Sequence, residues 1–407
     1  MSSHMADITP APQSPGVRTG EHDGGAPTRG REGPHILFLA QLPPPVHGVT
    51  VVSGKVFDKL RSLPGAQVEH IWLGSADRLE DIGRRTPGKL VAFAKLLAGL
   101  LRRRLAGRRA DIAYLTLAPW THAAMRDALV AAAAKGAARR VLVHLHGEGL
   151  DRLLAGASPA DRLKRRLLRG VELVVITEKA KRLAEASGLF GAVHEMANAT
   201  TDPGPVQRGA ASRPVCGFLG NLDRRKGVLR FIDMLSVLHA GGATLTGRVA
   251  GGDTPDLTSD RLRSDAAKRG LAGSVEVLGP LYGPDKDRFL AGLDIFVYLS
   301  RHDHAPLVLI EAMSHGAVPI VLDTGGIAQI LGPALAANVL PDSLDDRSAA
   351  AAAAALVARY AANPSLLHHD RERARARYLA AYGEDVFRTR VAAIVAGAGS
   401  DADPRSC

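Results

Sequence analysis

The sequence has little cysteine, few aromatic residues and no long apolar run. Its two cysteines, Cys216 and Cys407, stand far apart among 407 residues, so they offer neither a disulfide framework nor a thiolate zinc site. No apolar stretch reaches the length of a membrane span. Residues 1–34 are rich in Gly, Pro, Ser and charge and lack the apolar core of a signal peptide, which predicts a disordered tail. We therefore expect a cytoplasmic protein in a reducing compartment.

Basic charge is concentrated in one segment of the chain. The formal net charge is +11, and residues 84–109 contain nine Lys or Arg and no Asp or Glu. Apolar residues from Leu90 to Leu105 recur close to a helical period, which predicts a basic amphipathic helix. Two interpretations stay open: peripheral contact with an anionic membrane surface, on the inner face of the membrane, or an outer helix packed on a sheet. Basic residues are not interleaved with aromatic ones, so we expect no nucleic-acid partner.

The length and the alternation of short apolar strands with helical patterns predict two α/β domains. A chain of 407 residues is too long for one ordinary core, and β-α alternation is typical of parallel sheets covered on both faces. The Gly- and Pro-rich segment 200–213 is the expected linker. Strands are expected at 35–40, 68–73, 111–117, 141–146, 173–176, 215–219, 275–278 and 318–322. Helices are expected at 123–135, 160–168, 348–360 and 384–396.

Residues 300–326 are the most informative segment. An apolar strand ends there, a polar loop with Asp303 follows, a helix begins near Pro306 and contains Glu311, and a second strand leads to a Gly-Gly turn. The N–H groups and the positive dipole end of a helix N-terminus favour an anionic ligand. The two carboxylates are eight positions apart, one on each side of that anion site. A nucleotide sugar, with a central diphosphate and hydroxyl-rich ends, suits this arrangement.

Three other segments follow predicted strands, whose carboxyl ends form the ligand-binding edge of open α/β sheets. Gly48 ends a Pro-rich turn that could let backbone approach a ligand. Lys226 stands at a helix start, where a cation opposes the dipole, so a bound anion explains it best. His144 and His146 end a strand. We expect the two imidazoles to point to opposite faces, so that only His146, beside Gly147, faces the cleft.

Together these segments resemble the retaining GT-B glycosyltransferases of family 4, the glycosyl transferases group 1, over roughly residues 35–395. The E-x7-E signature of that family stands here as Asp303-x7-Glu311. The resemblance implies a GT-B fold, with two Rossmann-like, doubly wound parallel-sheet domains facing a central cleft. It implies an acceptor domain at 35–207, a nucleotide-sugar donor domain at 208–383, a helix crossing back to the first domain at 384–396 and a disordered tail at 397–407.

The resemblance also implies roles for particular residues. The catalytic set is His146, Lys226, Asp303 and Glu311. The donor-binding set is Gly48, Asn221, Lys226, Gly279, Tyr282, Asp303, Pro306, Leu307, Val308 and Glu311, and the acceptor side has His47, Gly147 and Glu148. Asn221 stands where the family has Arg, and Arg224 or Arg225 are the candidates to replace that charge. Asp285 and Asp287 form a D-x-D pattern, which we interpret as a helix N-terminus and not as a metal site.

The implied activity is that of a hexosyltransferase acting on a nucleotide-diphosphate sugar, most simply a UDP-sugar. The acceptor would be a hydroxyl of a glycan, a lipid-linked molecule or a small molecule in cell-envelope or exopolysaccharide biosynthesis. No cofactor and no metal ion are expected. Two alternatives remain: a GT-B sugar-nucleotide epimerase, and a catalytically weak nucleotide-sugar-binding protein. Transfer of sugar to an acceptor separates the first function from both.

Overall fold

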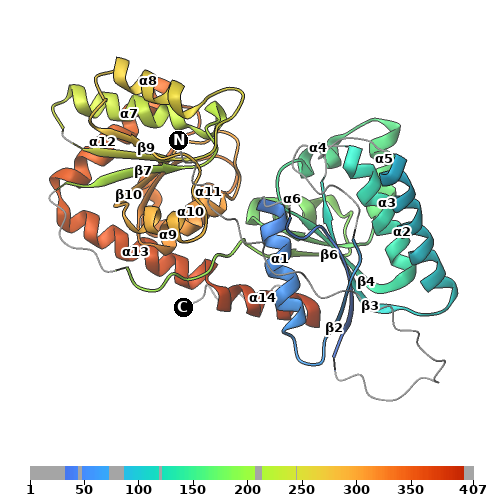
Figure 1. The fold of residues 1–407 in the computed structure, drawn as a ribbon. Helices are drawn as coiled ribbons and strands as arrows, with labels where there is room; N and C mark the ends of the chain where they lie inside the picture. The colour runs from blue at the N-terminus through green and yellow to red at the C-terminus, as the bar shows by residue number, and fades with distance from the viewer. Residues whose placement is uncertain are drawn as a thin grey trace, which may run out of the picture.

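The computed structural model describes residues 33–44, 48–72, 87–118, 122–206, 213–243 and 245–397. They form two α/β domains that lie side by side, each built on one sheet (Figure 1). Several predictions fall outside the described residues: the tails at 1–32 and 398–407, His47, residues 84–86 and the linker positions 207–212.

The first domain has six parallel strands in the order β2-β1-β3-β4-β5-β6. The strands are β1 (His35–Leu39), β2 (Gln67–His70), β3 (Ala110–Leu117), β4 (Ala138–Leu145), β5 (Glu172–Val175) and β6 (Ala192–Glu195). The helices are α1 (Gly48–Arg61), α2 (Pro87–Leu105), α3 (His122–Ala137), α4 (Leu150–Ala155), α5 (Pro159–Leu168) and α6 (Glu178–Ser187). Apolar clusters cover both faces of the sheet, which is why β1, β3 and β4 are almost continuously apolar.

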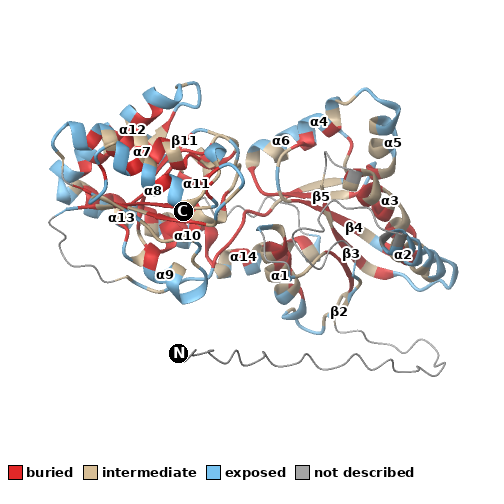
Figure 2. Ribbon diagram, turned by 45° about the horizontal axis from the view of Figure 1, so that its top comes forward, coloured by how far each residue is buried: buried red, intermediate tan, exposed pale blue. Residues whose placement is uncertain are grey.

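The second domain repeats this plan in the order β12-β11-β10-β7-β8-β9. Its strands are β7 (Val215–Leu219), β8 (Thr246–Ala250), β9 (Val275–Val277), β10 (Ile295–Tyr298), β11 (Val318–Leu322) and β12 (Val339–Leu340). Its α-helices are α7 (Val228–Ala240), α8 (Ser259–Lys268), α9 (Gly283–Ala291), α10 (Leu307–Ser314), α11 (Ile327–Leu331), α12 (Asp346–Ala362) and α13 (Pro364–Tyr382), with 3-10 turns η2 (Arg224–Lys226) and η3 (Pro333–Asn338). Figure 2 shows both sheets buried between helices whose outer faces are exposed. The predicted fold class is confirmed.

The last helix, α14 (Glu384–Ala396), returns to the first domain (Figure 1). Its residues Phe387, Val391 and Ile394 are buried in the cluster formed by α1 and the inner face of the first sheet. Arg140 of β4 holds the end of the helix, because its guanidinium donates to the carbonyl oxygens of Ile394 and Val395 at 2.7 and 2.6 Å. A cation at the carboxyl end of a helix also complements the helix dipole.

Two departures from the predicted strands have simple causes. The four-residue strand β6 was not predicted, because Ala-Val-His-Glu is too short and too polar to stand out as an apolar run. The strand predicted at 141–146 instead runs from Ala138 to Leu145, paired along its length with β3, so that His146 lies just beyond it.

The two domains meet at the carboxyl ends of their strands. A Cβ on Gly326 would lie 2.4 Å from Cγ2 of Thr177, so only glycine allows this approach between the domains. The amide of Gln329 donates to Glu195 at 2.7 Å and accepts from the backbone N–H of Glu178 at 2.9 Å. Asn198 donates to the carbonyl of Ala305 at 3.0 Å. Direct polar contacts therefore hold the two strand-end edges together.

Candidate active site between the two domains

Lys226 and Asp303 lie together at the point of the second sheet where the strand order reverses. The strand order places β7 beside β10, and the chain winds away from this point on both sides. Lys226 follows β7 and Asp303 follows β10. Their side chains meet, with Lys226 Nζ 3.1 and 3.2 Å from the two oxygens of Asp303. Ligands of doubly wound folds bind at such a switch point, so the topology itself brings these two residues to the candidate site.

Asp303 is held in the charged form. The hydroxyls of Tyr298 and Ser300 donate to its Oδ2 at 2.7 and 2.9 Å. Burial alone would raise the pKa of Asp303, but the charge of Lys226 and the hydrogen bonds from Tyr298 and Lys226 together bring it below its ordinary value. The Asp303 carboxylate therefore stays ionised at neutral pH and faces the site as an oriented acceptor.

The conformation of the turn that carries Lys226 is fixed by a glycine and by a side-chain hydrogen bond. Gly227 has a φ of 89°, and a Cβ there would lie 2.4 Å from the carbonyl oxygen of Leu299. Asp223 accepts from the N–H of Arg225 at 2.8 Å, and its carboxylate pairs with the Arg225 guanidinium at 2.7 Å. Arg225 is thus already neutralised by Asp223. Of the two suggested substitutes for the missing cation at position 221, only Arg224 has no ion pair with a described residue.

The start of α10 lies next to Asp303, and Glu311 lies one further turn into the helix. Pro306 precedes the helix and has no side-chain cap, so the first N–H groups, including those of Leu307 and Val308, have no partner within the helix. Glu311 is largely buried and accepts from Lys286 of α9 at 2.7 Å. The helix start is therefore bracketed by two lysine–carboxylate pairs, Lys226–Asp303 and Lys286–Glu311.

Lys55 of α1 approaches this region from the first domain. Burial lowers the pKa of Lys55, while the charges of Glu384 and Glu311 oppose that shift. Gly48, at the start of the same helix, has no positive φ, and a Cβ there would meet nothing within 4 Å. Neither its backbone conformation nor packing against described residues requires a glycine at position 48, and its predicted contact with a ligand stays a prediction.

The loop before α9 carries the two remaining donor-side candidates. Gly279 has a φ of 76°, and its carbonyl accepts from Gly251 at 2.8 Å at the end of the neighbouring strand β8. Tyr282 precedes α9 and exposes most of its ring to solvent. Asn221 is exposed at the end of β7. These residues lie at the same edge of the sheet as Lys226, since all of them follow strands of the second domain.

His144 in β4 and His146 just beyond it point to the same side of the sheet, and the prediction of opposite faces is wrong. Their ring centroids lie 3.8 Å apart. The reason is the two-residue repeat of a strand: positions 144 and 146 point the same way, and positions 144 and 145 would not. His144 is fully buried, with its Nδ1 2.6 Å from the Tyr114 hydroxyl, and burial lowers its pKa well below the ordinary value. His146, two residues further along the chain, is half-buried.

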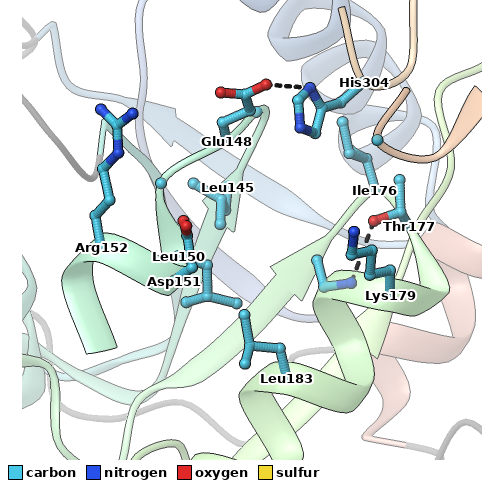
Figure 3. Close-up of a pocket in the computed structure, with 14 residues that line it drawn as sticks. Leu145, Glu148, Leu150, Asp151, Arg152, Ile176, Thr177, Lys179, Leu183 and His304 are labelled. Atoms are coloured by element: carbon cyan, nitrogen blue, oxygen red, sulfur yellow. Dashed lines mark hydrogen bonds and ion pairs between the residues drawn. The ribbon is translucent and has the colours of Figure 1, made fainter. Parts of the chain in front are cut away.

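A pocket of about 250 Å³ opens on the first-domain side of the crevice (Figure 3). Its apolar part is formed by Leu145, Leu150, Ile176 and Leu183. Gly147, Glu148, Thr177 and Lys179 add polar groups, and His304 and Gly325 close it from the second domain. In Figure 3, Glu148 and His304 point toward one another across the pocket, with Oε1 of Glu148 2.5 Å from Nδ1 of His304. Burial lowers the pKa of His304, and the Glu148 charge opposes this shift.

The two carboxylates of the D-x-D pattern make contacts with nearby side chains. Asp285 pairs with Arg288 one turn along α9, and Asp287 lies 3.8 Å from His315. Lys286, between them, points to Glu311 instead. Within the described ranges, no cluster of three or more His, Cys, Asp or Glu could hold a metal ion. Asp253, another acidic residue at a strand end, accepts from the backbone and hydroxyl of Ser259 and so orders the start of α8.

Three residues of the candidate site were not predicted from the sequence: Lys286, Lys55 and His304. Lys286 is 25 positions from Glu311, and no local pattern relates them. Lys55 looks like an ordinary helix lysine until the domains are assembled. His304 is adjacent to Asp303 and could have been found, since it stands in the same polar loop, but its partner Glu148 belongs to the other domain.

Comparisons with known proteins relate the second domain to one family model. Residues 206–377 match the family model described as "Glycosyl transferases group 1". A glycogen synthase of Methylocella silvestris is 30% identical over 199 residues, covering 46% of this chain and 37% of that protein. Glycogen synthase 2 of Geobacter metallireducens is 31% identical over 121 residues, which is 30% of this chain and 24% of that protein. This chain therefore spans well under half the length of these relatives.

Solved structures resemble nearly the whole chain. A glycosyltransferase from Rickettsia africae has a TM-score of 0.67 at 14% identity, covering 90% of this chain and 98% of its own. HepE of Anabaena in complex with UDP-glucose has a TM-score of 0.63 at 17% identity, covering 90% of this chain and all of its own (100%). At these identities the likeness establishes the fold, which is GT-B, while the second domain carries the sequence pattern of glycosyl transferases group 1.

Proposed function

We propose that this chain is a retaining glycosyltransferase of family 4 that transfers a sugar from a UDP-sugar to a hydroxyl acceptor. The observation that carries the proposal is the start of α10, which lies between the pairs Lys226–Asp303 and Lys286–Glu311 at the switch point of the donor-type domain. Free N–H groups and Lys226 supply positive charge for a diphosphate. Carboxylates on either side supply acceptors for hydroxyl groups, Asp303 for the sugar and Glu311 for the ribose.

The reaction would proceed without a covalent intermediate on the protein. The bond from the anomeric carbon to the diphosphate oxygen breaks, and the bond to the acceptor oxygen forms on the same face. The acceptor proton passes to the leaving diphosphate oxygen. Lys226 and the N–H groups at α10 stabilise the charge that develops on the diphosphate, and the two domain walls hold the reactants together. His146 and Gly147 would form the opposite wall, where the sugar ring would lie.

The acceptor would occupy the pocket of Figure 3. Its apolar floor offers a surface for a sugar ring face or an apolar aglycone, and Glu148, Lys179 and His304 offer hydrogen bonds to hydroxyls. We propose a glycan or lipid-linked acceptor, as used in cell-envelope or exopolysaccharide synthesis. A second candidate is a nucleotide-sugar-binding protein with little catalysis. It is favoured by two features: Lys226 is already paired with a carboxylate, and position 221 supplies no second cation.

The donor should be identifiable without knowing the acceptor. A native-state ligand stabilises by mass action, so UDP and the correct UDP-sugar should raise the melting temperature, whereas GDP and ADP should do so less. The same donor should then give slow sugar release or transfer when acceptor extracts are added. Stabilisation without any turnover would favour the binding protein, sugar interconversion without transfer would favour an epimerase, and no stabilisation by any nucleotide sugar would refute the proposal.

Transfer should not require a divalent cation. Charge on the leaving diphosphate would be met by Lys226 and by the helix N–H groups, so activity measured after EDTA treatment and desalting should equal that of untreated protein. Added Mg²⁺ or Mn²⁺ should give no increase. Loss of turnover in EDTA that Mn²⁺ restores would contradict this prediction and direct attention to Asp285 and Asp287.

A further inference from the structure

Exposed apolar side chains gather on one helix of the first domain. Among the described residues, six large apolar side chains are more than half exposed, and five of them are Trp72, Leu90, Val91, Leu101 and Leu105. Trp72 follows β2, and the other four lie on α2. Isolated exposed apolar residues are normal on protein surfaces, but such a gathering on one element calls for an explanation.

The sequence pattern of α2 divides between two sides of the helix. Phe93, Leu97 and Leu100 face inward and join the core between the sheet and α3. Leu90, Leu101 and Leu105 face outward, and the small residues Ala94 and Ala98 between them are exposed too. The outward positions recur at intervals of three or four, so they form one continuous stripe. A helix packed on a core ordinarily presents polar residues to solvent, so this second apolar stripe is not explained by folding.

Cations border the outward stripe. Lys95, Arg102 and Arg104 are exposed on α2, and Arg108 follows the helix. None of these four forms an ion pair with another described residue, whereas Arg103, which faces inward, pairs with Glu69. The described residues of α2 include no acidic side chain at all. The outward face of α2 thus combines apolar side chains with positive charge that no carboxylate of a described residue neutralises.

We propose that this outward face of α2 docks on the surface of a bilayer that contains anionic phospholipid. The leucines would enter the boundary between headgroups and acyl chains, while the lysine and arginines contact the lipid phosphates. Charge complementarity favours this occupant over a second copy of the chain, because two such faces would repel each other. No helix of the described chain is long and apolar enough to cross a membrane.

The position of α2 is compatible with activity at a membrane. The helix lies on the side of the first domain that is turned away from the second domain in both views (Figures 1 and 2). Docking there leaves the crevice between the domains and the pocket of Figure 3 accessible. The surface shares no residue with the proposed active site, so membrane binding and sugar transfer can be tested separately.

Co-sedimentation with vesicles tests the proposal. The full-length protein should bind vesicles of phosphatidylcholine with phosphatidylglycerol at low salt, bind neutral phosphatidylcholine vesicles at least about tenfold more weakly, and be released as ionic strength rises. The double variants Leu101→Ser/Leu105→Ser and Lys95→Glu/Arg102→Glu should each bind at least about tenfold more weakly. The control Leu379→Ser/Lys268→Glu changes an exposed leucine and an exposed lysine of the second domain and should bind like the unmodified chain.

Any of the following results would overturn the proposal. Unchanged binding by the leucine variant would mean that the apolar stripe has no part in docking. Absence of binding to anionic vesicles, with a dimer that the leucine variant converts to monomer, would assign the face to self-association. Binding to RNA but not to vesicles would assign it to nucleic acid. UDP-induced stabilisation of the same variants should stay unchanged, which shows that they fold and keeps a failure here distinct from a failure of the glycosyltransferase proposal.

Discussion

Replacing Lys226 with alanine is expected to lower kcat by about 10²–10³-fold, the effect of removing one pre-oriented donor from a developing oxyanion. Lys226 is the cation that the structure places beside both Asp303 and the start of α10. In the free protein it neutralises Asp303, and with donor bound it would bridge that carboxylate and the diphosphate. Steady-state kinetics with the identified UDP-sugar would measure the change.

Two further variants make the Lys226 result specific. Lys226→Arg keeps the charge and should retain part of the activity, although its planar group cannot reproduce the same position. Arg224→Ala removes the neighbouring cation that could replace the charge missing at position 221, and it should lower kcat less than Lys226→Ala does, because only Lys226 contacts Asp303. If Lys226→Ala and Arg224→Ala lose activity equally, general positive charge matters and the specific bridge does not. Wild-type kcat in Lys226→Ala would contradict the assignment of the diphosphate to this turn.

Glu311→Ala is expected to weaken binding of UDP by about 10- to 150-fold, because it removes a charge-assisted hydrogen bond to ribose worth about 1.5–3 kcal/mol. Folding should survive, since the carboxylate is partly exposed and only its ion pair with Lys286 is lost. Isothermal titration calorimetry with UDP and with inorganic pyrophosphate would show which part of the ligand loses affinity. Only UDP affinity should fall, because pyrophosphate lacks the ribose.

The pair Lys286–Glu311 supplies the control for this experiment. Lys286→Ala breaks the ion pair but leaves the Glu311 carboxylate in place, so it should weaken UDP binding less than Glu311→Ala does. Asp287→Ala, which changes an exposed carboxylate of the same region, should have no effect. Equal losses in the Glu311 and Lys286 variants would show that the pair orders α9 against α10 and does not itself bind ribose.

The elements around the site could be predicted where the pattern was local. The strands at 215–219 and 318–322 and the helix at 384–396 have the expected bounds, because each is a compact apolar or periodic run with clear flanking residues. The edge strand β6 could not be predicted, because its pairing with β5 and not its composition makes it a strand. The relative orientation of His144 and His146 was predicted wrongly, although the two-residue repeat of strands contained the answer.

The sequence by itself determined the two α/β domains with parallel sheets, because these follow from periodicity, and its short motifs indicated candidate residues at strand ends. Only the tertiary structure decided which of those residues meet. Lys226 and Asp303 are 77 positions apart, and Glu148 and His304 belong to different domains. The tertiary structure also divided the apolar residues of α2 between core and solvent. Such outcomes depend on strand order and domain packing, which bring together residues that no local sequence pattern relates.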